Sequence, residues 1–166
     1  GMLGRGDIPP NASVVDIGCG QGLMASLLQA CAELQRTGGW PQAWPVAASA
    51  RAYCGIELMP KDVARADAAL RGLALQPRFV CDDMCTADIP GCDLVVILDV
   101  LHYVDHAAQD GVLRRVRDAL APDIGNELGK TGRLLLRVGD ADNASGFAWS
   151  QWVDRIVTWA RGHRVP

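Results

Sequence analysis

The sequence predicts a doubly wound α/β domain, in which helices cover both faces of a mainly parallel sheet. Short apolar segments typical of buried strands alternate along the chain with segments of helical periodicity, as in βαβ units. The first apolar segment runs into three alternating glycines, Gly18, Gly20 and Gly22. Acidic residues follow several of the other strand-like segments, and ligands of parallel sheets bind beyond the carboxyl ends of the strands.

Length and composition fit a single domain over residues 1–166, with 49% apolar and 21% charged residues. Residues 2–12 are expected to form an N-terminal lead-in, and residues 38–50, with two prolines and two tryptophans, a loop insertion. The net charge of −3 gives no basic footprint for nucleic acid. Without an apolar run of about 18 residues or a signal-peptide pattern, we expect a cytoplasmic protein with no membrane span.

Six cysteines occur at positions 19, 31, 54, 81, 85 and 92, mostly inside apolar patterns. There is no Cys-x-x-Cys pair, and nothing completes a zinc site around the two cysteines that lie four residues apart. We therefore expect reduced thiols and no metal.

The first three strands and two helices are expected in the first half of the chain. A strand over residues 13–17 precedes a helix over 23–36, which ends at Gly38 and Gly39. A second strand over residues 52–57 leads through Pro60 into a helix over 61–71, because proline suits the first turn of a helix. Residues 78–81 form a short third strand. The apolar face of the first helix is expected to comprise Leu23, Leu27, Cys31 and Leu34, widened by Met24 and Leu28.

The second half continues the alternation. Residues 93–98 are the most apolar run and are expected to form a central strand, buried on both faces. A helix over 107–120, a fifth strand over 133–138 and a last helix over 147–160 follow. The last helix holds three tryptophans, which suit a core or an interface or, alternatively, a substrate cage.

The glycine turn predicts a surface for a ligand of nucleotide size, because glycines leave no Cβ above the turn. A dinucleotide fingerprint reads G-x-G-x-x-G, with an acid about 20 residues later. Here the spacing is G-x-G-x-G, and Glu57 lies about 35 residues after Gly22. Asp16 would also repel a pyrophosphate. A cationic ligand without phosphates therefore fits better.

At these positions the sequence resembles the class I S-adenosylmethionine-dependent methyltransferases of small-molecule type, over most of its length. Residues 14–22 (VVDIGCGQG) are similar to the first family motif, residues 55–58 (GIEL) to the second and residues 79–84 (FVCDDM) to the third. Residues 92–104 (CDLVVILDVLHYV) resemble the fourth motif, and residues 132–138 (GRLLLRV) the fifth strand. The resemblance implies a Rossmann-like sheet and the cofactor S-adenosylmethionine, with S-adenosylhomocysteine as product.

The resemblance also implies roles for individual residues. Asp16 is expected near the methionine end, through water or backbone, and Glu57 on both ribose hydroxyls. Asp83 would accept from the adenine amino group, and Met84 would donate its N–H to the ring. Asp82 stands where the family usually has glycine, so a shift by one residue stays open. The full set of expected cofactor-binding residues is Asp16, Gly18, Cys19, Gly20, Gly22, Glu57, Leu58, Asp83, Met84, Leu98 and Asp99.

His102 and Asp99 are the candidate catalytic residues. His102 is expected either to act as general base on a substrate hydroxyl or to hold a loop by hydrogen bonding. Asp99 is expected to contact either the substrate or the amino group of the cofactor. The fourth motif is typical of O- or C-methylation of small molecules, and the Asn/Asp-Pro-Pro-aromatic motif of N-methylating DNA and RNA members is absent.

The acceptor is expected to be a small molecule, apolar or aromatic given Trp40 and Trp44, and not a nucleic acid; a homo-oligomer stays open. Family members usually carry seven strands, so the resemblance implies that this chain lacks the C-terminal strands. Either the protein is a trimmed member or, as we expect, it continues beyond the residues given. Two alternatives remain: a non-catalytic interaction module that binds the cofactor, and an NAD-dependent Rossmann oxidoreductase.

Overall fold

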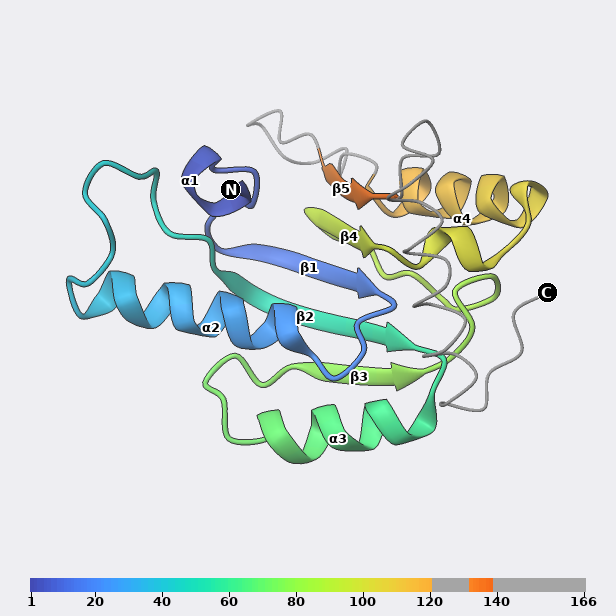
Figure 1. Ribbon diagram of the computed structural model, residues 1–166, viewed down its shortest axis with the longest axis horizontal. Coiled ribbons are helices and arrows are strands. Elements are labelled where there is room, and N and C mark those ends of the chain that lie inside the picture. The colour runs from blue at the N-terminus through green and yellow to red at the C-terminus, as the bar shows by residue number, and fades with distance from the viewer. Residues whose placement is uncertain (121–131, 139–166) are drawn as a thin grey trace, which may run out of the picture.

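The computed structural model describes residues 1–120 and 132–138. These residues form a five-stranded sheet in the order β3-β2-β1-β4-β5, with every neighbouring pair parallel. Figure 1 shows the strands side by side, with their arrowheads pointing the same way. The strands are β1 (Ala12–Ile17), β2 (Ala50–Glu57), β3 (Arg78–Cys81), β4 (Leu94–Leu98) and β5 (Arg133–Arg137).

Helices pack on both faces of the sheet. They are α1 (Met2–Arg5), α2 (Leu23–Arg36), α3 (Pro60–Leu70), the short 3₁₀ helix η1 (Leu101–Tyr103) and α4 (His106–Ala119). The core on one face joins α2 and the end of α3 to Val14 of β1, whereas the core on the other face joins α4 to Val15. Because successive strand residues point to opposite faces, these two neighbouring valines anchor the two cores.

The predicted elements of the described residues are confirmed, with bounds within two residues of those expected. Residues 94–97 are fully buried, as expected for a central strand between two helical layers. α1 was not predicted; it lies in the lead-in and ends at Gly6, which has a φ of 72°. The helix expected over 147–160 and its tryptophans lie outside the described residues.

The apolar face predicted for α2 is partly wrong. Its buried residues are Met24, Ala25, Leu28 and Cys31. Leu23 and Leu34, by contrast, are 81% and 46% exposed. The strip facing the sheet is centred on positions 24, 28 and 31, at helical spacing, and the two exposed leucines lie near the helix ends, at its flanks.

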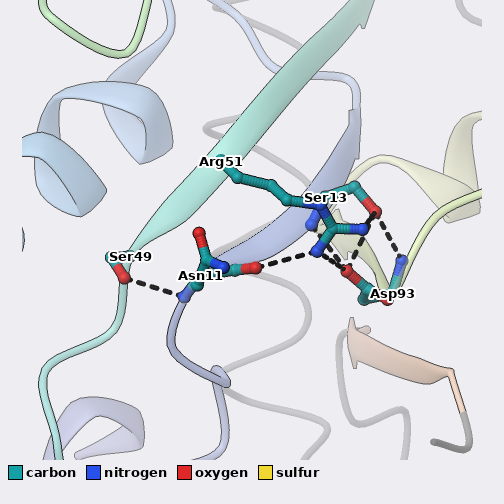
Figure 2. A network of polar contacts seen from close by, with 5 residues as sticks. All are labelled: Asn11, Ser13, Ser49, Arg51 and Asp93. Atoms are coloured by element: carbon teal, nitrogen blue, oxygen red, sulfur yellow. Dashed lines mark hydrogen bonds and ion pairs between the residues drawn. The ribbon is translucent and has the colours of Figure 1, made fainter.

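A hydrogen-bond network joins the beginnings of β1, β2 and β4 (Figure 2). Asp93 Oδ2 accepts from the Ser13 N–H at 2.8 Å and from Arg51 Nη1 at 2.5 Å. Arg51 Nη1 also donates to the Asn11 carbonyl oxygen at 2.8 Å, and the Asn11 N–H donates to Ser49 Oγ at 2.8 Å. Burial acts to raise the pKa of Asp93, but the hydrogen bonds from Ser13 and Arg51 outweigh burial and lower it. The network fixes three strands at the edge opposite their carboxyl ends.

Asp93→Ala is expected to lower the free energy of unfolding by about 2 kcal/mol at pH 7, because hydrogen bonds to charged groups contribute about 1.5–3 kcal/mol. The pKa of Asp93 is lower in the folded chain, so its contribution is present above the unfolded pKa of about 3.9 and is lost as the pH falls through the folded pKa. Urea unfolding at pH 7 and pH 3 measures both values, with the exposed Asp88→Ala as control. An equal loss at the two pH values would contradict this role.

Candidate functional site

The carboxyl ends of the strands gather the predicted polar residues at one edge of the sheet. The chain adds β2 and β3 on one side of β1 and then returns to place β4 and β5 on the other side. The strand order therefore reverses between β1 and β4, which is where ligands bind in open α/β sheets. The glycine turn follows β1, Glu57 ends β2, and Asp99 directly follows β4.

The three glycines of the turn differ in how much space surrounds them. Gly18, Gly20 and Gly22 all have positive φ, at 73°, 55° and 79°. A Cβ on Gly18 would lie 2.5 Å from Val100 Cγ1, and a Cβ on Gly22 would lie 2.6 Å from Leu70 Cδ1. A Cβ on Gly20 would meet no atom within 4 Å. Packing thus accounts for two of the glycines, and the third leaves open space above the backbone.

Cys19 fills the space under the turn. Its side chain is buried, and a Cβ on Gly55 would lie 2.6 Å from its sulfur. Burial and then the nearby charges of Asp16 and Glu57 raise the pKa of the Cys19 thiol. Because the thiolate is the nucleophilic form, a neutral thiol here is a packing group.

Glu57 connects the end of β2 to the glycine turn. Its Oε2 accepts from the Gly20 N–H at 2.9 Å, and its Oε1 accepts from the Met59 N–H at 2.9 Å. A carboxylate offers about four acceptor positions, so each oxygen keeps one for a ligand. The two backbone bonds fix the direction in which those positions point. The carboxylate can therefore accept two further hydrogen bonds at once.

Asp16 lies one residue before the end of β1 and is only 5% exposed. Its Oδ2 accepts a hydrogen bond from Tyr53 Oη at 2.6 Å. Burial raises the pKa of Asp16 to about 6; the bond from Tyr53 acts against this rise, and the charge of Glu57 adds to it. Tyr53 was not among the predicted residues. The signal for it is the strand register, because Val14 pairs with Tyr53 and Asp16 lies two residues further on the same face.

The two acids after β3 stabilise their own turn. Asp82 Oδ1 accepts from the Asp83 N–H at 2.7 Å, and Asp83 Oδ1 accepts from the Cys85 N–H at 2.8 Å. Asp83 is exposed, and Asp82 is half-buried. Both side chains lie at the carboxyl end of β3, within the turn expected to face a nucleobase.

Arg115 of α4, which was also not predicted, holds the chain that follows the turn. Its guanidinium donates to the carbonyl oxygen of Met84 and, at 2.6 Å, to that of Ala87. The backbone around Met84 is thereby fixed to α4, which packs against the same core cluster as Met84. The sequence carries no signal for this contact, because Arg115 stands among other arginines of an exposed helix face.

Asp99 and His102 follow β4. Asp99 has a φ of 58°, which is uncommon for a residue other than glycine, and such backbone strain clusters at functional sites. Its carboxylate pairs with the guanidinium of Arg137 at the end of β5. His102 lies in η1 and is exposed, with its ring centroid 4.2 Å from that of Tyr103.

Two leucines complete the predicted set. Leu58, directly after β2, is 45% exposed, and Leu98, the last residue of β4, is half-buried. Both lie at the same edge of the sheet as Glu57 and Asp99.

The charge of this edge favours a cationic ligand. The acids Asp16, Glu57, Asp82 and Asp83 end or follow the strands, and residues 18–22 of the turn include no basic side chain. Within the described part of the chain, no three His, Cys, Asp or Glu residues are arranged to hold a metal ion. No helix among the described residues is long and apolar enough to cross a membrane.

Comparison with known proteins gives a family match. A family model described as a methyltransferase domain matches residues 15–124. An S-adenosylmethionine-dependent methyltransferase from Mesorhizobium loti has 26% identity and a TM-score of 0.50, with 71% of this chain and 47% of that chain covered. The N-methyltransferase NodS from Bradyrhizobium japonicum, in complex with S-adenosylhomocysteine, has 19% identity and a TM-score of 0.50, with 68% and 49% covered. The chain thus spans about half the length of these structures. No curated protein matches significantly.

Asp16→Asn is expected to stabilise the protein at pH 7.5 by up to about 3 kcal/mol, since one pKa unit corresponds to about 1.4 kcal/mol. A carboxyl whose pKa is raised to about 6 favours folding while it is protonated and loses that contribution as the pH rises from about 4 to 6. The gain should therefore be much smaller at pH 4. Thermal unfolding at the two pH values measures the difference, with the exposed Asp67→Asn as control. Destabilisation at pH 7.5 would show that the ionised carboxylate is well accommodated.

Proposed function

Because the chain belongs to the class I S-adenosylmethionine-dependent methyltransferases, we propose that it binds S-adenosylmethionine at the carboxyl edge of the sheet and transfers the methyl group to a small molecule. The observation that supports this most directly is the bond from the Gly20 N–H to Glu57, with open space above Gly20. The chain spans about half the length of the structures it matches. The activity proposed for the protein is therefore inferred from this one domain.

The residues of the edge fit the cofactor. The two acceptor positions left on Glu57 match the two ribose hydroxyls, which carry one donor each. The backbone at Gly20 leaves room for a ligand to lie against the turn. Asp16 offers a negative charge for the ammonium of the methionine end. A pyrophosphate, in contrast, would meet these acids without a basic side chain in the turn.

The turn after β3 is the proposed binding site for the adenine of the cofactor. Asp83 would accept from the adenine amino group, and the N–H of Met84 would donate to the ring. Asp82 is the alternative acceptor, shifted by one residue. Arg115 supports either arrangement, because it holds the carbonyl oxygen of Met84 and so restrains the backbone of the turn at this residue.

Bound S-adenosylmethionine supplies an electrophilic methyl group, whose bond to sulfur breaks with the electron pair left on sulfur as the acceptor atom bonds to the carbon. The protein contributes mainly alignment, which is worth up to about 7–11 kcal/mol of the barrier in favourable cases. An acceptor that arrives protonated must lose its proton, and the exposed His102 beside the switch point is the candidate base. Asp99, held by Arg137, is the candidate substrate contact.

The acceptor is proposed to be a small molecule methylated at oxygen or carbon. Residues 98–104, from the last residue of β4 onward, read LDVLHYV and lack the Asn/Asp-Pro-Pro-aromatic motif of N-methylating nucleic-acid enzymes. The net charge of −3 disfavours a polyanionic substrate. The fold by itself does not choose the acceptor atom, since NodS, which shares it, is an N-methyltransferase.

Glu57→Ala is expected to weaken the binding of S-adenosylhomocysteine at least tenfold, because each hydrogen bond to a charged group is worth about 1.5–3 kcal/mol. Calorimetric titration measures the affinity. The matched control is Glu33→Ala, an exposed glutamate of α2 that pairs with Arg36. Glu57→Gln keeps the size of the side chain and should also lose affinity. A thermal midpoint near that of the wild type would show that this variant is folded. An unchanged affinity in both Glu57 variants would contradict the site.

Methyl transfer is expected to small acceptors and not to nucleic acid. The protein is incubated with S-adenosylmethionine carrying a labelled methyl group and with pools of phenols, activated carbon acids, amines, tRNA and DNA. Label should appear in the hydroxyl or carbon-acid pool, and the Glu57→Ala variant should transfer less. Label found only in tRNA or DNA, or only in amines, would contradict the proposed acceptor class.

A further inference from the structure

Tyr53 of β2 lies buried beneath the proposed cofactor site. It is 4% exposed, and its ring packs edge-on against Phe79, with a centroid distance of 5.9 Å. Phe79 is itself confined, because it is one of the groups that a Cβ on Gly22 would strike. The phenol oxygen therefore has one well-defined position, 2.6 Å from Oδ2 of Asp16.

The two oxygens of Asp16 have different surroundings. Oδ2 accepts the hydrogen bond from Tyr53, and Oδ1 accepts none from the described residues. No fully buried side-chain oxygen or nitrogen in the described part of the chain lacks a partner. Oδ1 is therefore not fully buried and retains a small surface open to solvent, although Asp16 as a whole is 5% exposed.

From this geometry we propose that Tyr53 is a positioning residue for the cofactor. By binding Oδ2, it turns Oδ1 of Asp16 toward the solvent side, where the ammonium of the methionine end would be held. The inference rests on the proposed function of the site. Phenylalanine at position 53 would keep the ring packing but leave the carboxylate free to rotate about χ2, a broad torsion in aspartate.

No cation among the described residues balances Asp16. The groups that face it are Tyr53 and Glu57 of β2 and Cys19 of the turn, none of them positive. β4 contributes only apolar residues, and the buried face of α2 contributes one ionisable group, the Cys31 thiol. A buried carboxylate without a counter-charge is costly, and a ligand ammonium would supply that charge.

The test compares the pH dependence of S-adenosylhomocysteine binding in the wild type and in Tyr53→Phe, by calorimetry between pH 5.5 and 8.5. Protonated Asp16 cannot pair with an ammonium, so wild-type affinity should fall as the pH drops through about 6. Loss of the phenol bond raises the pKa of Asp16, because that bond favours the charged form. For a rise of about one pKa unit, the variant should therefore lose about threefold in affinity at pH 6.5 and about eightfold at pH 5.5 through protonation. A further loss, present also at pH 8.5, should come from the carboxylate that is now free to rotate.

Phe79→Leu is the matched control, because it disturbs the same core without removing the hydroxyl group. Its effect on affinity should be equal at all pH values. If the wild type binds no S-adenosylhomocysteine, the proposed function itself fails. If the wild type binds and the affinity of Tyr53→Phe falls below it, at every pH, by no more than that of Phe79→Leu, the positioning role is overturned.

Should Tyr53→Phe not fold, carbon-13 NMR of the wild type gives a second readout. The Asp16 carboxyl and Tyr53 Cζ resonances should titrate with one shared midpoint near pH 6, because the phenol bond changes when the carboxylate gains a proton. A Tyr53 resonance that does not follow the Asp16 midpoint would overturn the inference.

Discussion

The hydrogen bond from the Gly20 N–H to Glu57 is the interaction on which the site depends. It joins the turn after β1 to the last residue of β2, and so converts two separate strand ends into one ligand surface. The glycines of the turn have positive φ, which bends the turn toward β2 and brings the Gly20 N–H within hydrogen-bonding distance of Glu57. A second bond, from the Gly18 N–H to the Ile56 carbonyl oxygen at 2.8 Å, also holds the turn to β2. The remaining residues of the site are placed relative to this link.

The stabilising network of Asp93 and the candidate functional site lie at opposite edges of the sheet. At the beginnings of the strands, Arg51 and Asp93 satisfy each other and tie three strands together. At the carboxyl edge, Asp16 is buried beside Glu57 without a cation among the described residues, and this raises its pKa to about 6. A buried carboxylate with a raised pKa is typical of a functional site, because perturbed pKa values cluster at catalytic and binding residues. The core that covers both faces holds this carboxylate in place.

Much of the architecture was predictable, because strand and helix periodicity and the glycine turn are local properties of the sequence. Glu57 was found from its position at a strand end, and Asp16 from the resemblance of residues 14–22 to a family motif. Tyr53 and Arg115 were missed, because their roles follow from strand register and from a contact between residues far apart in the sequence. The prediction of the buried face of α2 was partly wrong, because helical spacing alone does not show which apolar residues meet the sheet. Leu23 has nearly the right spacing but lies outside the interface.

The structure of the protein in complex with S-adenosylhomocysteine tests the central claim most directly. We expect one ligand at the carboxyl edge, with both ribose hydroxyls hydrogen-bonded to Glu57 and the ammonium directed toward Oδ1 of Asp16. The ligand should lie against the backbone of Gly20. A ligand bound elsewhere, or an NAD pyrophosphate lying over the glycine turn in a parallel soak, would contradict it.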